Sequence, residues 1–394
     1  MRGPKEPRRG TALHQLSIIQ DGSLLIQDGV LVEVGATRRV ENLALARHAT
    51  EVSAAGRVVM PGFVDSHTHL LFPPGLSSPE APPSESALRA IPSVRLKARA
   101  RAVLEAMARH GTTTVEVKTS CGADEGVALK ILRVLAELKH EPLDVVPTVL
   151  FCAAMAPGSE ETRQPAWRQL CERLLPKVQR RRFARFADVR SQDDACFSDY
   201  LEAVRRLGLG RKVHADHAAP AAAVTAAIEK GAASIDHLEH ITPTEAARLG
   251  PADAIATLLP CASFHGAGRF APARTLIDAG AAVALATNYN PRHTPTLNMQ
   301  TAVSLACRYL HMTLEEAVSA ATINGAHALA CASHVGSLEP GKSADLVVLS
   351  VSDYRELASG FGANLVQMTM KRGEFIYEEG GVAPRPPQEL RPSW

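Results

Sequence analysis

The sequence predicts an α/β protein: a TIM, or (β/α)8, barrel with a small β domain formed by both chain termini. The length of 394 residues exceeds what one compact core usually holds, but it accommodates a barrel of about 250 residues and an accessory domain. Apolar strands alternate with helices through the centre of the chain, and short strands with turns occupy both ends. We therefore place the domain boundaries at residues 1–58, 59–333 and 334–394.

Two Asp-Gly dipeptides lie between apolar runs near the N-terminus, at Asp21-Gly22 and Asp28-Gly29, and each is a good hairpin signal. They predict short strands on both sides of each turn, beginning at Ser17. Near the C-terminus, the segments 344–349 and 373–377 predict two further strands. Because the termini of a domain often lie close together, we expect both ends of the chain to pair in one β domain.

The central region predicts eight strands with helices between most of them. The clearest helices are 93–110 and 125–139, where apolar residues recur at helical spacing. This alternation is typical of a (β/α)8 barrel. The predicted strands are Val58–Val64, Thr113–Val117, Leu143–Leu150, Phe183–Val189, Lys212–His214, Ser234–His237, Ala254–Leu259 and Ala282–Ala286.

The composition argues against several classes of protein. With 43 basic and 41 acidic residues and a net charge of +2, we expect no nucleic acid and no anionic membrane as partner. No run approaches the ~18 apolar residues of a transmembrane helix, and residues 1–5 lack a signal-peptide core, which predicts a cytoplasmic protein. The seven cysteines include no C-x-x-C pair, so neither a disulfide framework nor a thiolate zinc site is indicated.

The strongest local motif is an H-x-H at His67 and His69, directly after the first predicted barrel strand. In a strand, residues i and i+2 point to the same face, so the two imidazoles project together. Active sites of TIM barrels lie at the carboxyl ends of the strands, and two imidazoles that converge there can hold one divalent metal. A bare H-x-H is common by chance, and its position gives this one weight.

Three other strand ends also provide polar residues of the kind that bind ligands. His214 ends strand five and is followed by Asp216 and His217, His237 ends strand six, and Asn288 follows strand eight. A single buried histidine is more often an ordinary core residue than a ligand. Four strand ends of one barrel that all provide such residues are much less expected by chance, so we predict one shared site.

These motifs resemble those of the amidohydrolase superfamily. Residues 61–69, Pro-Gly-Phe-Val-Asp-Ser-His-Thr-His, are similar to its first-strand motif, and residues 335–349 are similar to its return into a β-sandwich. Within the superfamily the chain most resembles the imidazolonepropionase family, over nearly its whole length. The resemblance implies a distorted TIM barrel with a small β-sandwich domain. Further similar segments are 111–118, 146–148, 214–216, 236–239, 287–291 and 313–324.

The resemblance also implies a site. His67, His69 and His214 would be metal ligands, and His237 would contact the substrate or the metal-bound water. Members with one metal lack a carboxylated lysine at the end of strand four, and Arg190 near that position agrees with one divalent metal, zinc or iron. Such a metal would lower the pKa of its water toward ~7 and polarise the scissile carbonyl. The implied reaction is hydrolytic opening of a cyclic amide in histidine breakdown.

The chain departs from the family at several of these positions. Asn288 stands where the family has an aspartate that is both ligand and general base, and a neutral amide coordinates weakly but cannot take a proton. His217 replaces an expected glutamate, and Cys121 an expected tyrosine. The histidine expected after strand three and the arginine expected soon after the H-x-H are absent.

Several roles therefore stay open. Asp216, His217 or His237 could serve as a substitute base. Lys118, at a strand end, is predicted to contact an anionic substrate or to be a salt-bridge partner. Asn290 is predicted to contact substrate or to fix the turn after strand eight.

Three functions compete: an active hydrolase with a changed substrate, a catalytically impaired relative that binds a metal or small molecule, and a related deaminase of a cyclic amidine. For the hydrolase, the predicted partner is a small cyclic amide or imidazolone-like molecule. The sequence does not determine the oligomeric state, and a homodimer is compatible with it.

Overall fold

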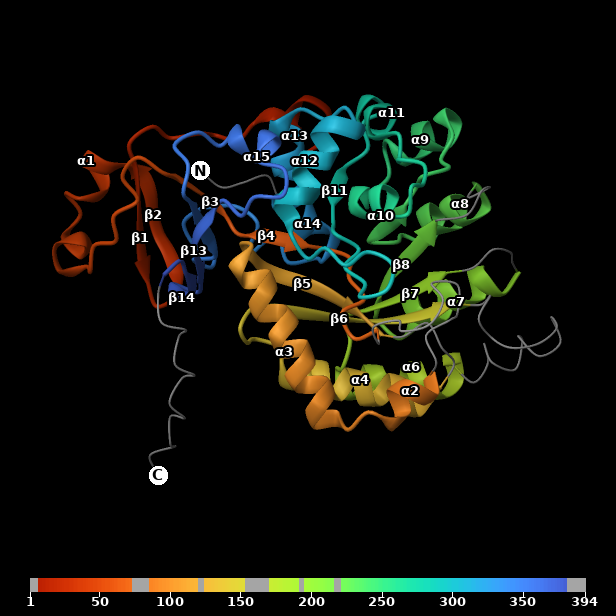
Figure 1. Cartoon of the computed structure of the whole chain (residues 1–394). Helices are drawn as coiled ribbons and strands as arrows, with labels where there is room; N and C mark the ends of the chain where they lie inside the picture. The colour runs from red at the N-terminus through yellow and green to blue at the C-terminus, as the bar shows by residue number, and fades with distance from the viewer. Residues whose placement is uncertain are drawn as a thin grey trace.

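The computed structural model describes residues 6–72, 85–119, 124–152, 170–190, 195–215 and 221–380. Eight parallel strands with helices around them form a barrel, and sheets built from the chain termini lie at one side of it, at left in Figure 1. The predicted fold is therefore confirmed. The barrel strands are β4 (Phe63–Asp65), β5 (Thr112–Lys118), β6 (Asp144–Cys152), β7 (Phe186–Arg190), β8 (Gly210–Ala215), β9 (Ser234–His237), β10 (Ile255–Leu258) and β11 (Val283–Leu285).

The two helices predicted most clearly are observed as α3 (Ser93–Arg109) and α4 (Glu125–Glu137). The side chain of Asp124 caps α4 by accepting a hydrogen bond from the backbone N of Val127 at 3.0 Å. Apolar faces of the surrounding helices pack on the barrel and form its core. The other helices are α1 (Thr37–Val40), α2 (Glu85–Ala90), α6 (Leu175–Arg181), α7 (Ala195–Arg206), α8 (Ala221–Glu229), α9 (Pro243–Leu249), α10 (Pro260–His265), α11 (Ala273–Asp278), α12 (Met299–Tyr309), α13 (Leu314–Ala321), α14 (Ile323–Ala328) and α15 (Glu356–Ser359).

The barrel is distorted where its first and last strands meet. Hydrogen-bonded pairing runs from β4 round to β11, but within the described ranges β4 and β11 do not form a ladder with each other. Instead, the carboxylate of Asp65 accepts bonds from the backbone N and Oγ1 of Thr287 at 3.0 and 2.6 Å. The backbone N of His69 donates to Tyr289 O at 2.7 Å. Helix α14 contacts both strands, so the barrel is closed by the Asp65 side chain, by an isolated bridge between Thr68 and Tyr289, and by this helix.

The first predicted strand, Val58–Val64, is divided in two. Its first part is β3 (Val58–Pro61), which pairs with the terminal sheet, whereas β4 pairs with barrel strand β5. The division falls at Gly62, where a Cβ atom would lie 2.3 Å from Cγ2 of Thr113. Glycine is therefore required for the chain to pass β5 this closely and enter the barrel.

The two ends of the chain pair as predicted. A four-stranded sheet has the order β14-β13-β12-β3 and combines β3 with three C-terminal strands. The N-terminal hairpin joins this region because Leu31 exchanges backbone hydrogen bonds of 2.8 Å with Gly341 and Lys342. The predicted boundary at residue 58 falls at the start of β3 and stays a prediction. The additional strands are β1 (Gly22–Gln27), β2 (Val30–Ala36), β12 (Leu346–Leu349), β13 (Val366–Lys371) and β14 (Glu374–Glu378).

Only one of the two predicted N-terminal hairpins forms. Asp28 and Gly29 adopt φ values of 52° and 76°, as a type I′ turn requires, and they connect β1 to β2. The strand expected to begin at Ser17 is wrong, because Ser17 and Asp21 also have positive φ values, 55° and 49°, which extended strands do not accommodate.

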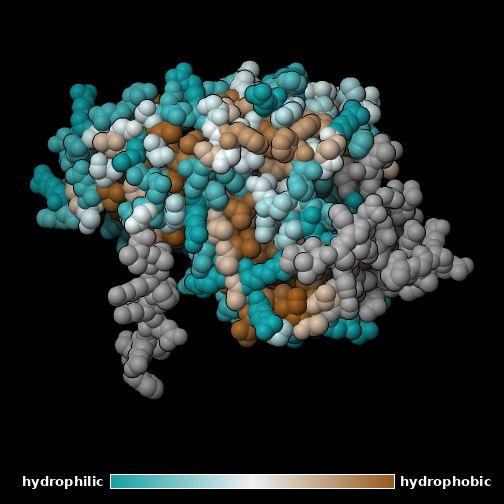
Figure 2. Space-filling model, in the orientation of Figure 1, coloured by the Kyte–Doolittle hydropathy of each residue, from teal (hydrophilic) through white to brown (hydrophobic). Residues whose placement is uncertain are grey.

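On the face shown in Figure 2, hydrophilic and apolar residues of the described part of the chain are interspersed. This mixture agrees with the charged fraction of 21%. Among the helices that the structure describes, none combines the length and the apolar character needed to cross a bilayer.

An ion-pair cluster joins the barrel to the terminal sheet. Asp144, at the start of β6, lies 2.7 Å from Nζ of Lys371 in β13, which also pairs with Asp345. Asp144 further contacts Arg372, and Nδ1 of His140 lies 2.9 Å from its carboxylate. Burial raises the pKa of Asp144, but Lys371, the His140 bond and Arg372 together hold it below its ordinary value.

Substitution of Gly62 by alanine tests the strand crossing. We expect Gly62→Ala to lower the free energy of unfolding by about 1–3 kcal/mol, because its Cβ would overlap Thr113. Thermal or denaturant unfolding measures the loss. Gly268→Ala is the control, since the nearest atoms to its Cβ would be 3.9 Å away. An equal loss in both variants would contradict the crossing constraint.

The pH dependence of stability tests the ion-pair cluster. Because the pKa of Asp144 is lowered in the folded protein, its contribution is present above its unfolded pKa of about 4 and lost as the pH falls below that value. We expect Asp144→Asn to be less stable by about 1–3 kcal/mol at neutral pH. This difference from the unsubstituted chain should shrink below about pH 4. Unfolding temperatures measured from pH 7 to pH 3 would show it; a constant difference would be inconsistent with this assignment.

Candidate metal centre

Three imidazoles converge at the carboxyl ends of the barrel strands. His67 and His69 follow β4, and His214 lies in β8. The Nε2 atoms of His67 and His69 are 3.2 Å apart, and the ring centroids of His67 and His214 are 4.7 Å apart. The ligand atoms of all three lie within 4.8 Å of one another, and the three side chains are buried. The two histidines of the H-x-H motif and the histidine of the fifth barrel strand therefore lie together, as the sequence predicts.

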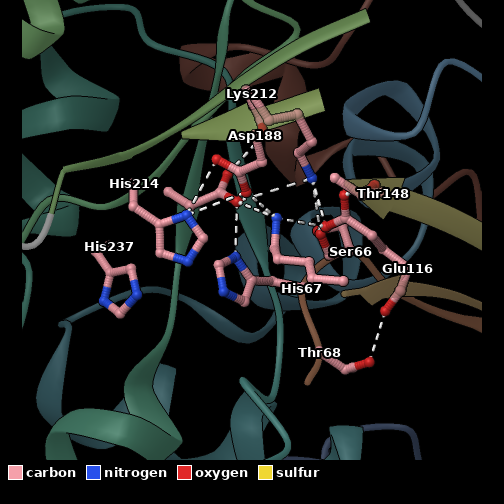
Figure 3. A network of polar contacts seen from close by, with 12 residues as sticks. Ser66, His67, Thr68, Glu116, Thr148, Asp188, Lys212, His214 and His237 are labelled. Atoms are coloured by element: carbon pink, nitrogen blue, oxygen red, sulfur yellow. Dashed lines mark hydrogen bonds and ion pairs between the residues drawn. The ribbon is translucent and has the colours of Figure 1, made fainter. Parts of the chain in front are cut away.

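Two carboxylates orient these imidazoles from behind, as Figure 3 shows around His67 and His214. Nδ1 of His67 lies 2.7 Å from Oδ2 of Asp236, and Nδ1 of His214 lies 3.0 Å from Oδ2 of Asp188. Neutral imidazoles in these positions carry the hydrogen on Nδ1 and present the Nε2 lone pair to the site. This arrangement of carboxylate, histidine and open nitrogen is typical of metal-binding histidines.

The protonation states agree with this arrangement. Burial, reinforced by the nearby ammonium of Lys118, holds the pKa of His67 well below its usual value. Burial raises the pKa of Asp236, but the ammonium groups of Lys212 and Lys118 and the His67 bond hold it well below its usual value. The imidazole is therefore neutral and the carboxylate ionised, as metal coordination requires.

A divalent cation fits this set of donors. Among the described residues, the buried Nδ1 of His69 and Oδ1 of Asn288 have no hydrogen-bond partner. Such atoms are costly to bury unless something else satisfies them. A cation bound by the three imidazoles would fix the orientation of His69, whose Nδ1 lacks a hydrogen-bond partner that could do so.

Inside the barrel, next to the imidazoles, lies a buried charge cluster composed of Glu116, Lys118, Asp188, Lys212 and Asp236. Nζ of Lys118 is 2.5 Å from Asp188, 3.0 Å from Glu116 and 3.2 Å from Asp236. Nζ of Lys212 is 2.7 Å from Glu116, whose other oxygen accepts from Thr148 at 2.5 Å. Three carboxylates face two ammonium groups, so the cluster has an excess negative charge beneath the site that favours a bound cation.

His237 completes the group of imidazoles. Its ring centroid is 5.5 Å from that of His67 and 5.3 Å from that of His214, and Figure 3 shows it beside them. Its Nδ1 lies 3.2 Å from Oε1 of Glu239. The backbone of His237 and Leu238 has φ values of 81° and 68°, which non-glycine residues adopt at an energetic cost.

The two asparagines after β11 differ in their surroundings. Asn288 is buried with a φ of 54°. Asn290 is tied into the following turn, because its Oδ1 accepts from the backbone N of Arg292 at 3.0 Å and its backbone exchanges bonds with Thr294. These contacts give Asn290 a role in shaping the turn, and its predicted contact with substrate stays a prediction.

Lys118 is fully enclosed by its three carboxylates rather than facing a substrate. Its contacts favour the salt-bridge alternative of the sequence analysis, and substrate binding by Lys118 stays a prediction without a contact to support it. Asp216 and His217, proposed as substitute bases, lie outside the described residues, as does Cys121.

Sequence reasoning did not find the carboxylates that orient the histidines, nor the role of Lys212. One signal was available, because strands enclosed on both faces are usually apolar throughout. Here polar residues occupy alternate positions instead, as Glu116 and Lys118 do in β5 and Lys212 and His214 do in β8. Alternating charges in a barrel strand indicate residues that point inside the barrel.

Comparisons with known proteins agree with this geometry. Residues 58–376 match the amidohydrolase family. The imidazolonepropionase of Porphyromonas gingivalis (strain ATCC BAA-308 / W83) is 36% identical over 395 residues, 93% of this chain and 92% of that protein. That of Chloroflexus aggregans is 34% identical over 407 residues, 95% of each. The crystal structure of an adenosine deaminase from Xanthomonas campestris with bound zinc has a TM-score of 0.69 at 19% identity, covers 93% of this chain and 90% of that one, and shows the fold alone.

Metal content tests the donor set. We expect the purified chain to hold about one equivalent of divalent metal and His214→Ala to lose most of it, because a three-imidazole site would be reduced to two. Chelation should also lower the unfolding temperature, since bound metal at 100 times its Kd stabilises by about 2.7 kcal/mol. Elemental analysis and thermal unfolding measure both effects. The exposed His48→Ala variant is the control, and metal retention by both variants would exclude this site.

Proposed function

We propose that this chain, which belongs to the amidohydrolase family, hydrolyses the C–N bond of a cyclic amide as an imidazolonepropionase does. The observation that supports this most directly is the convergence of His67, His69 and His214 at the barrel mouth, with a carboxylate behind two of them. The identity of 34–36% to imidazolonepropionases along most of the chain favours a substrate of that class, an imidazolone-like ring.

The proposed cofactor is one divalent metal, zinc or iron, held by the three imidazoles with Asn288 at its margin. Imidazole nitrogens suit both metals. When bound, the metal would supply Lewis-acid polarisation of the amide carbonyl and a more acidic water. Arg190, at the end of β7, occupies the strand where a bridging lysine would support a second metal, which agrees with a single ion.

His237 is the residue that we assign to proton transfer. Asn288 cannot accept a proton, whereas an imidazole can. Nδ1 of His237 lies 3.2 Å from Oε1 of Glu239, so a carboxylate lies next to this imidazole and would stabilise its protonated form. His237 would take a proton from the attacking water and return it to the ring nitrogen as the C–N bond breaks, so the charge on the protein is unchanged after one cycle. Its ring is adjacent to those of His67 and His214.

The partner in this proposal is a small molecule, and the sequence predictions of a homodimer and a cytoplasmic location remain predictions. The binding-protein and deaminase alternatives are distinguished by the product formed. A metal-loaded chain that leaves every lactam and imidazolone intact would be a binding protein. Ammonia released from a cyclic amidine would identify a deaminase.

Kinetics of two variants test the mechanism. We expect ring opening of an imidazolone by the natural chain and a decrease in kcat of about 10²- to 10⁴-fold in His237→Gln, with metal content unchanged, because proton transfer would be lost. Loss of the substrate's ultraviolet absorbance measures the rate. His240→Gln, three residues further along, is the control. Unchanged kcat in His237→Gln would remove His237 from the mechanism.

A separate variant tests the departure at Asn288. If His237 transfers the proton, Asn288→Asp should change kcat less than about tenfold, because a second base adds little to a working one. A much larger gain of imidazolone hydrolysis would mean that the natural chain lacks its base and that this variant restores it.

A further inference from the structure

One lysine contacts three carboxylates in the interior of the barrel. Nζ of Lys118, in β5, lies 2.5 Å from Asp188 in β7 and 3.2 Å from Asp236 in β9, besides its contact of 3.0 Å with Glu116. All of these side chains have 0% exposure. Bulk solvent does not reach these side chains, so the ammonium and the carboxylates hold one another in position.

Two of the three carboxylates are those that orient imidazoles. Oδ2 of Asp236 accepts from Nδ1 of His67 at 2.7 Å, and the carboxylate of Asp188 is 3.0 Å from Nδ1 of His214. Each carboxylate thus lies between the Lys118 ammonium and an imidazole. The ammonium of Lys118 therefore connects the carboxylates that orient two histidines, one in the segment after β4 and one in β8.

We propose that Lys118 is a positioning residue for the metal centre, acting through Asp188 and Asp236 to keep the Nε2 atoms of His67 and His214 convergent. The inference rests on the proposed metal-binding function and deepens it. It gives Lys118 a role distinct from contact with substrate. Without the ammonium, the buried carboxylates of Asp188 and Asp236 would repel each other and turn away from the orientation that holds the imidazoles.

Lys212 shares this role only in part, because its ion pairs reach Asp236 but not Asp188. Its Nζ donates to Ser66 O at 2.9 Å and to Glu116 at 2.7 Å, and it lies 3.8 Å from Asp236. Through these contacts Lys212 mainly holds the carboxylate of Glu116 in place. The connection between Asp188 and Asp236 runs through Lys118.

The test replaces Lys118 by methionine, which retains the length of the side chain and removes its charge. The affinity for Zn²⁺ is measured by competition with a chromogenic chelator, and the Co²⁺-substituted protein is measured by visible absorption. We expect Lys118→Met to weaken the metal Kd by about 10- to 100-fold, the range for residues that support metal ligands. The Co²⁺ absorption bands should shift, because the geometry of the imidazoles would change.

Lys371→Met is the matched control. Lys371 is also buried and also bridges two carboxylates, Asp144 and Asp345, but it does so between the barrel and the terminal sheet. Both variants lose stability, so only a positioning role predicts a weakened Kd and shifted Co²⁺ bands in Lys118→Met alone. Lys118→Arg, which keeps the charge, should retain more affinity than Lys118→Met, and it provides the comparison should the methionine variant not fold.

The outcomes separate this inference from the proposed function. If the unsubstituted chain binds neither Zn²⁺ nor Co²⁺, the metal-dependent function fails. Suppose instead that it binds them, that the metal Kd of Lys118→Met is within about threefold of that of the unsubstituted chain, and that the Co²⁺ absorption bands do not shift. The metal-dependent function then stands, and the positioning role of Lys118 is overturned. Equal weakening in Lys118→Met and Lys371→Met would likewise overturn it, because a general loss of stability would then explain the effect.

Discussion

The interior of this barrel depends on an electrostatic constraint, because buried carboxylates and ammonium groups must all find partners there. Removal of one partner from such a network leaves a charge in a medium that solvates it poorly. The contacts of Lys118 connect β5, β7 and β9, and those of Lys212 connect β8 to β5. A register shift by one residue in any of these strands would point a charge to the wrong face. The charge cluster therefore fixes the strand register, and the strand register places the imidazoles.

Much of the fold could be predicted from the sequence, since alternation of apolar strands with helices is a local signal repeated eight times. The exceptions come from contacts between distant residues. Within Val58–Val64 the dipeptide Pro61-Gly62 is a local sign of a break, but that the two halves join different sheets depends on the close approach of Thr113 to Gly62. The failed hairpin at Asp21-Gly22 had the same dipeptide as the one that forms at Asp28-Gly29, so the dipeptide alone did not determine the pairing.

The site was predictable where it depends on strand ends and less so where it depends on the barrel interior. His67 and His69 lie two residues apart and were found from this period-two spacing, whereas the pairing of His214 with Asp188 requires the order of the strands in space. Lys118 shows the limit of such reasoning. A lysine at a strand end has the same sequence signal whether it extends outward to a substrate or inward to carboxylates, and only the packing distinguishes the two directions.

The passage of the chain through Gly62 couples the terminal sheet to the histidines of the site. Val58–Pro61 belongs to the terminal sheet, and five residues after Gly62 the same chain reaches His67. The peripheral sheet thus holds the entry to the segment that provides two of the three imidazoles. The terminal sheet and the barrel therefore do not behave as independent domains. A tilt or loss of the sheet would displace the short segment from Gly62 to His67, and with it the histidines at the carboxyl end of the barrel.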